Sequence, residues 1–214
     1  MSDYAIGDIQ GCFNSFKILL EKIKFDKNQD TLWLAGDIIN RGPDSDKMLN
    51  WAYENQNHIK LVLGNHDLHA IAVYYNIRKQ SKSDTLDKLF NNKNSDKWIS
   101  WLRTNPLMQY DNINNNKYIM IHAGIPPQIK LDDLIKHLKN LENKINSDQT
   151  IAIQTLSYIF NNQEKYNTQN KQELDIYLIN ALTRMRLCDQ DGNLDLVYKG
   201  PDIKKDNKFQ AWIF

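Results

Sequence analysis

The chain has 214 residues, with 27 Lys and Arg against 26 Asp and Glu and a formal net charge of +1. This length suits one domain, or one domain with an insertion, and is enough to bury a sizeable core. Because the charge is nearly balanced, no global field would attract nucleic acid or an anionic membrane. An anionic substrate must instead be held by a local cluster of residues.

The cysteines and the start of the chain indicate the compartment. Cys12 and Cys188 are isolated and show no Cys-x-x-Cys spacing, so we expect neither a zinc ribbon nor a disulfide framework. Met1-Ser2-Asp3 lacks a basic and then apolar leader, and no apolar run is long enough to span a bilayer. We therefore expect a cytoplasmic protein with no nucleic-acid or membrane partner.

Four short apolar runs each lead into residues that can bind a metal or a phosphate. The runs are residues 4–6, 32–35, 61–63 and 118–121, followed by Gly7-Asp8-Ile9-Gln10-Gly11, Gly36-Asp37-Ile38-Ile39-Asn40-Arg41-Gly42, Gly64-Asn65-His66-Asp67 and His122-Ala123-Gly124. Short aliphatic runs that stop at a glycine or another turn residue predict buried strands. Ligands grouped at strand ends are typical of an α/β active site.

Helical spacing follows each of the first three runs. Asn14 or Ser15 could cap the first helix, and Pro43 and Asp44 lead into the second. The predicted inward positions are Phe16, Leu19, Leu20 and Ile23, then Met48, Leu49 and Ala52, then Leu68, Ile71, Ala72 and Tyr75. This alternation predicts an α/β fold with parallel strands and places the first three motifs at the carboxyl edge of one sheet.

The later part of the chain shows a different pattern. One short amphipathic helix is expected around residues 98–102, and turn residues at 112–116 and at Asp191-Gly192 predict two hairpins. Residues 131–180 are mostly helical in pattern and predict an insertion or cap. The chain ends in the apolar run Ala211-Trp212-Ile213-Phe214, whereas native termini are usually polar. We therefore expect a single domain, 1–214, that lacks its C-terminal strands.

The four motifs together offer oxygen and imidazole ligands from Asp8, Asp37, Asn65 and His122. Such a mixed set suits manganese, cobalt, iron or zinc. Asp37, the middle aspartate, could bridge two ions, which at about 3.5–4 Å apart lower the pKa of a shared water and stabilise charge at phosphorus.

Two neighbouring residues complete the predicted site. His66, adjacent to Asn65, could act as a general acid, and Arg41 could clamp phosphate oxygens. Taken singly, Asp8 could mark only a turn, His122 a buried core histidine and Arg41 a surface residue. Their joint occurrence in order favours the functional interpretation, while His58 and His69 are interpreted as structural and His137 as solvated.

These motifs resemble the signature of the calcineurin-like metallophosphoesterases. The run of residues 61–69 and Thr183-Arg184-Met185-Arg186 further resemble the symmetrical bis(5'-nucleosyl)-tetraphosphatases of bacteria, over Tyr4 to about Trp212. The resemblance implies an α+β or α/β fold with two packed mixed β-sheets flanked by helices. It also implies a two-metal centre that hydrolyses diadenosine tetraphosphate to two ADP.

The resemblance also assigns roles to individual residues. Asp8 and Asp37, with Gln10 beside them, would hold the first ion, and Asp37, Asn65 and His122 the second. The two ions are expected to be Mn²⁺ or Co²⁺, with Zn²⁺, Fe²⁺ or Mg²⁺ as alternatives. His66 would be the acid, and Arg41 with Arg184 or Arg186 would bind phosphate.

The sequence departs from the family pattern at two places. Gln10 stands where the superfamily usually has histidine, and an amide oxygen is a weaker ligand than imidazole. The family's later Gly-His-Trp segment does not occur in these 214 residues. We therefore expect little turnover from this 214-residue form and activity from an extended one.

Two other functions are compatible with parts of this sequence. Serine/threonine protein phosphatases of the superfamily resemble Gly-Asp-x-x-Asp-Arg-Gly and Gly-Asn-His-Glu, and Asn40 and Asp67 both depart from that pattern. A non-enzymatic chain that binds nucleotides without hydrolysis is the third interpretation. The sequence leaves the oligomeric state open.

Overall fold

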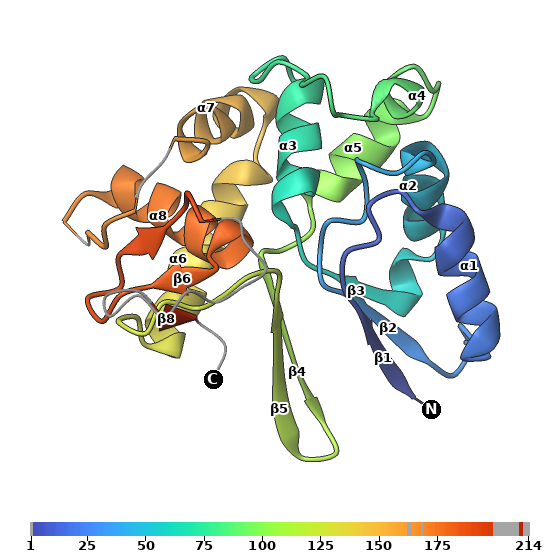
Figure 1. Ribbon diagram of the computed structural model, residues 1–214, viewed down its shortest axis with the longest axis horizontal. Helices are drawn as coiled ribbons and strands as arrows, with labels where there is room; N and C mark the ends of the chain where they lie inside the picture. Colours follow the sequence, from blue (N-terminus) through green and yellow to red (C-terminus); the bar gives the residue numbers. More distant parts are fainter. Residues whose placement is uncertain (1, 162–163, 168, 199–209, 212–214) are drawn as a thin grey trace. The chain divides into compact units, whose positions relative to one another are not determined.

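The computed structural model describes residues 2–161, 164–167, 169–198 and 210–211. It divides into two compact units, Met1–Met120 and Ile121–Phe214, and Figure 1 labels elements of both. Each unit is described by itself. The predicted organisation as one domain with a helical cap stays a prediction.

The first unit contains a parallel sheet. Its strands are β1 (Asp3–Ile6), β2 (Thr31–Leu34) and β3 (Ile59–Leu61), in the order β1-β2-β3. Helix α1 (Phe13–Lys22) connects β1 to β2, and α2 (Ser45–Glu54) with the short 3-10 helix η1 (Gln56–His58) connects β2 to β3. Parallel neighbours need such crossovers. The predicted α/β alternation is confirmed.

Burial in this unit centres on β2 and α2. Leu32 and Leu34 are fully buried in the middle strand. The predicted inward positions Met48, Leu49 and Ala52 of α2 are also fully buried. Apolar side chains on both sides of the middle strand explain why it reads as a nearly continuous hydrophobic run.

Two predictions for α1 are wrong. The helix begins at Phe13 after Cys12, whose side chain makes no capping bond, so neither Asn14 nor Ser15 is the cap. Phe16 is the one buried residue of the helix, and Leu19 is 37% exposed. Phe16 packs edge-on against Trp51 of α2, with 4.7 Å between ring centroids, whereas Leu20 and Ile23 are only partly buried.

Three further helices and a hairpin complete the first unit. Helix α3 (Asn65–Tyr74) begins inside the third motif, and α5 (Ser95–Arg103) confirms the predicted amphipathic helix. The four-residue α4 (Asp87–Phe90) was not predicted from the sequence. Strands β4 (Met108–Ile113) and β5 (Asn116–Ile121), which ends at the boundary between the units, pair as the predicted hairpin.

The second unit is mostly helical. Helices α6 (Leu131–Ile145), α7 (Gln149–Ile159) and α8 (Lys171–Arg184) confirm the helical pattern of residues 131–180. Strands β6 (Leu187–Cys188), β7 (Leu194–Asp195) and β8 (Gln210–Ala211) form an antiparallel sheet in the order β7-β6-β8. The β6–β7 pair confirms the second predicted hairpin. Of the predicted terminal strand, residues 212–214 lie outside the described residues.

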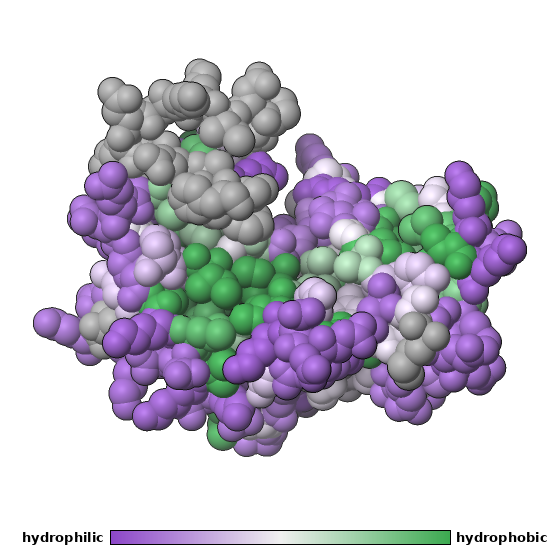
Figure 2. All heavy atoms as spheres, turned by 90° about the horizontal axis from the view of Figure 1, so that it is seen from below, coloured by the Kyte–Doolittle hydropathy of each residue, from purple (hydrophilic) through white to green (hydrophobic). Residues whose placement is uncertain are grey.

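The α/β class is confirmed, but the sheets are not mixed in the described residues. The three-stranded sheet of the first unit is parallel and that of the second is antiparallel, because helices join the strands of the first and a tight turn joins β6 to β7. On the face seen in Figure 2, patches of hydrophobic residues lie among hydrophilic ones. Within the described residues, no helix is long and apolar enough to cross a membrane.

Candidate metal and phosphate site

Backbone hydrogen bonds join the loops that follow β1 and β2. The Gln10 N–H donates to the Asp37 carbonyl at 2.8 Å, and the Gly42 N–H donates to the Gln10 carbonyl at 2.7 Å. These bonds hold the first two motifs against each other. The side chains of Asp8 and Asp37 consequently offer carboxylate oxygens within 4.8 Å of one another, as the order of the strands predicted.

Several residues of these loops adopt a left-handed backbone. The φ angles are 48° at Gln10, 52° at Asp37, 76° at Asn40 and 66° at Arg41. Non-glycine residues with positive φ are uncommon, and backbone conformations of this kind cost about 1–3 kcal/mol each. Such strain clusters at functional sites, where the surrounding hydrogen bonds maintain it.

Asp37 is buried at the N-terminus of α3. Its side chain accepts the backbone N–H of His66 at 2.7 Å, and the residue is only 2% exposed. The unsatisfied N–H groups and the dipole of a helix N-terminus favour a negative charge. The structure therefore brings Asp37 next to Asn65 and His66, the first two residues of α3, whereas Asp8 is exposed to solvent.

Asp67 connects the second and third motifs, a role that was not predicted from the sequence. Its Oδ2 accepts the N–H of Asp37 at 2.7 Å and that of Gly64 at 3.0 Å, and its Oδ1 accepts the N–H of Ile38 at 3.1 Å. The residue is fully buried. Its place in Gly-Asn-His-Asp was the signal that could have revealed it.

Gly64 is required by a close approach of two loops. A Cβ atom at this position would lie 2.5 Å from the Asp37 nitrogen and would collide with Asp37 Oδ1. We expect Gly64→Ala to lower the free energy of unfolding by about 1–3 kcal/mol and to displace Asp37. Urea unfolding followed by circular dichroism measures the first effect.

Gly7→Ala is the matched control, because nothing lies within 4 Å of a Cβ built there. Equal unfolding midpoints for the two variants would contradict the expected clash at Gly64.

The ring of His66 lies beside Asn40 and Asp37. Its Nδ1 is 3.2 Å from Asn40 Nδ2, and its Nε2 is 4.0 Å from Asp37 Oδ2. Burial lowers the pKa of His66, although the charge of Asp37 acts in the opposite direction. The Nε2 side of the ring therefore faces the carboxylate that is predicted to bridge the metals.

Arg41 is exposed and is oriented by the loop before α4. Its Nη1 donates to the Ser83 carbonyl at 3.0 Å and also bonds the Ser83 hydroxyl. A guanidinium carries five N–H donors, so these two bonds use only part of its capacity to bind phosphate. The contact with Ser83 had no signal in the sequence.

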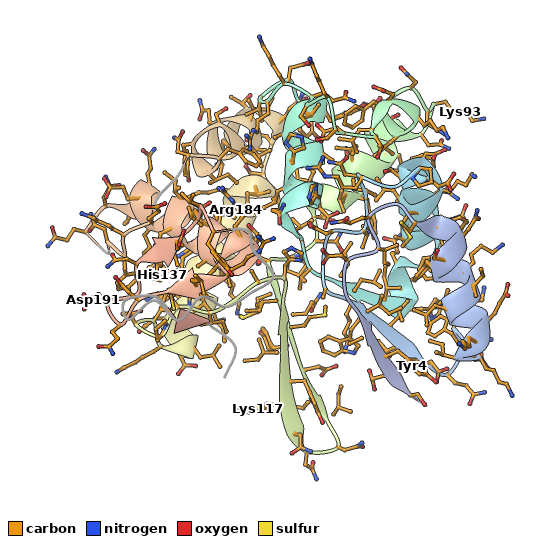
Figure 3. The ribbon with its side chains drawn as sticks, in the orientation of Figure 1. Tyr4, Lys93, Lys117, His137, Arg184 and Asp191 are labelled. Atoms are coloured by element: carbon orange, nitrogen blue, oxygen red, sulfur yellow. The ribbon has the colours of Figure 1, made fainter. Side chains whose placement is uncertain are left out.

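The second unit contains the remaining predicted residues. His122 is half-buried after β5, and the next residue, Ala123, donates its N–H to the Leu182 carbonyl of α8 at 2.7 Å. Arg184, labelled in Figure 3, is the last residue of α8, is exposed, and donates from Nη1 to Asn180 Oδ1 at 2.9 Å.

Arg186 lies two residues further along and is also exposed. Its Nη1 is 3.5 Å from the Tyr198 carbonyl. Within the second unit, a backbone hydrogen bond thus joins the fourth motif to the C-terminal end of α8. Arg184 ends this helix, and Arg186 follows it.

The sequence matches the family model of the calcineurin-like phosphoesterases over residues 4–210. The chain therefore belongs to this family, as the motifs predicted.

Among its relatives are proteins named bis(5'-nucleosyl)-tetraphosphatase, symmetrical. That of Cellvibrio japonicus is 40% identical, and the alignment covers 99% of this chain and 78% of the relative. The proteins of Chromobacterium violaceum and Buchnera aphidicola are each 38% identical, with 94% and 96% of this chain and 71% and 75% of the relatives covered. The resemblance to this group is confirmed.

Proposed function

We propose that the chain is a metal-dependent hydrolase that cleaves diadenosine tetraphosphate symmetrically to two ADP. The observation that carries the proposal is the buried carboxylate of Asp37, which lies beside Asp8 and at the start of α3. Membership of the phosphoesterase family and the relatives' printed activity support this substrate over others.

The donor atoms of the motifs fit a pair of divalent ions. We propose that Asp8, Gln10 and Asp37 hold the first ion, and that Asp37, Asn65 and His122 hold the second. Carboxylate, amide and imidazole ligands suit Mn²⁺ or Co²⁺ and also accept Zn²⁺, Fe²⁺ or Mg²⁺. When bound, such ions supply an activated water and neutralise charge on the phosphates.

The chain's own side chains would position the substrate and move the proton. His66 would act on the leaving phosphate oxygen as the proposed acid through Nε2, the ring nitrogen that faces Asp37, the proposed bridging ligand. Arg41, oriented by Ser83, would bind phosphate oxygens, and Arg184 or Arg186 would do so from the second unit.

We also propose that residues 1–214 act as one phosphoesterase domain with residues 131–180 as its cap. The thiols of Cys12 and Cys188 are both free, which is typical of a reducing compartment. The cytoplasm is therefore the proposed location.

The direct test is an assay of the protein with diadenosine tetraphosphate and Mn²⁺, with nucleotides separated by anion exchange. We expect ADP as the sole product however slow the turnover is, loss of that turnover after chelation and its recovery when Mn²⁺ is restored, because the donor set needs its ions.

The products decide between the alternatives. AMP and ATP together would contradict symmetrical cleavage. Hydrolysis of a phosphopeptide with the dinucleotide left intact would indicate a protein phosphatase. Nucleotide binding without turnover in the metal-loaded protein would indicate an inactive binding protein.

A further inference from the structure

The side-chain amide of Asn40 has a fixed orientation. The residue is fully buried, and its Oδ1 accepts the backbone N–H of Arg41 at 2.8 Å and that of Thr85 at 3.0 Å. Backbone N–H groups can only donate, so both bonds require an oxygen at this position. The NH2 group of Asn40 must therefore lie on the opposite side.

That NH2 group has two partners. It donates to Asp84 Oδ1 at 3.0 Å and lies 3.2 Å from Nδ1 of His66. A carboxylate can only accept, which again identifies the atom as nitrogen. One hydrogen of the amide points to Asp84, which leaves the other for the ring of His66.

Asp84 is itself anchored as an ionised carboxylate. Its Oδ2 accepts the Ser81 N–H at 2.7 Å and bonds Nε2 of His69 at 2.8 Å. Burial alone raises the pKa of Asp84, but hydrogen bonds from Asn40, His69 and Ser81 outweigh it and hold the pKa well below its ordinary value. His69, interpreted as structural from the sequence, thus supports the group that orients Asn40.

We propose that Asn40, anchored by Asp84, is a positioning residue that keeps the proton of neutral His66 on Nε2. An amide NH2 can only donate, so the Nδ1 that it meets must be the unprotonated nitrogen of the imidazole. The proton then sits on Nε2, which lies 4.0 Å from Asp37 Oδ2. This deepens the proposed function and rests on it only for the use of that proton.

The choice of tautomer decides which nitrogen of the neutral ring can donate a hydrogen bond. An Nε2–H that faces the leaving oxygen would stabilise the negative charge that develops there as a hydrogen-bond donor, because a neutral imidazole that lost its one proton would become an imidazolate. Without the donor at position 40, neutral His66 could place its proton on Nδ1 and present a bare nitrogen to the Asp37 side. Asn40 and Asp84 would prevent this without touching the substrate.

The test is nitrogen NMR of the full chain labelled with 15N-histidine, at about pH 8, above the ordinary histidine pKa. Protonated and bare imidazole nitrogens have well-separated 15N resonances. The chain has five histidines, and the signals lost in His66→Gln assign the ring of His66. We expect wild-type His66 to show a bare Nδ1 and a protonated Nε2, in metal-free and in Zn²⁺-loaded protein.

The decisive variant exchanges the two side chains, as Asn40→Asp with Asp84→Asn. It keeps the net charge and allows the same number of bonds, because the new amide at position 84 could donate to the new carboxylate at position 40 and still accept from Ser81 and His69. Position 40 then presents an acceptor to His66, so the Nδ1 signal should change from bare to protonated. Asp87→Asn, an exposed change near Asp84, should leave the signals as in wild type.

Two results would overturn the proposal. One is a protonated Nδ1 in wild-type His66, and the other is an Nδ1 signal that stays bare in a folded exchange variant. Neither measurement uses a substrate, so failure of the proposed hydrolysis would be seen separately in the nucleotide assay.

Discussion

Asp37→Asn is expected to lower turnover of diadenosine tetraphosphate by more than the roughly 10–100-fold typical of a residue that only supports a metal ligand. Asparagine has the same shape and can still accept the His66 N–H through its oxygen. It lacks the charge that a bridging ligand supplies to two cations. Steady-state kinetics and metal content per chain measure both consequences.

The substitution separates charge from folding. The carboxylate of Asp37 is almost fully buried, and replacing a buried charge by an amide removes a desolvation cost. The unfolding midpoint should therefore not fall with the activity. Asp132→Asn, an exposed change on α6, should match wild type in both assays, and wild-type turnover with full metal content in Asp37→Asn would remove Asp37 from the ligand set.

Asp67→Ala is expected to destabilise the protein by about 3 kcal/mol or more. The change leaves three backbone N–H groups, those of Asp37, Ile38 and Gly64, without the carboxylate that accepts them. Each buried donor left without an acceptor costs about 1–3 kcal/mol. Urea unfolding gives the loss, and turnover should fall as well because the second and third motifs are no longer held together.

Asp67→Asn should have a smaller effect, because an oxygen at the Oδ2 position still accepts two of the three N–H groups. Asp87→Ala removes an exposed carboxylate that accepts one side-chain bond, from Gln80, and should change stability by less than about 0.5 kcal/mol. An Asp67→Ala midpoint equal to that of Asp87→Ala would show that Asp67 does not hold the motifs together.

Local sequence patterns predicted most elements of the first unit. Short apolar runs followed by helical spacing predicted β1, β2 and β3 with their helices. Burial of one face of a helix requires apolar residues at regular intervals along the sequence. The order of the strands was enough to place Asp8 near Asp37. The errors came where neighbours in space decide, as at Leu19, whose exposure depends on how α1 meets α2.

The loop before α4 shows why another part of the site was missed. Asn40 and Asp84 are 44 positions apart, and Arg41 and Ser83 are 42 apart. No period or spacing in the sequence connects such pairs. Residues 78–104 are mainly polar and predicted only one helix. The sequence does not show that polar groups of this stretch bind residues of another loop.

The sequence by itself determined the family and the set of side chains that can bind metal and phosphate. Both follow from short stretches of consecutive residues, whose ligand types and order along the chain can be read directly. The tertiary structure alone decided that Asp67 holds two motifs together and that the amide of Asn40 points its NH2 group at His66. Hydrogen bonds have direction, and their direction is set only when residues distant along the chain meet.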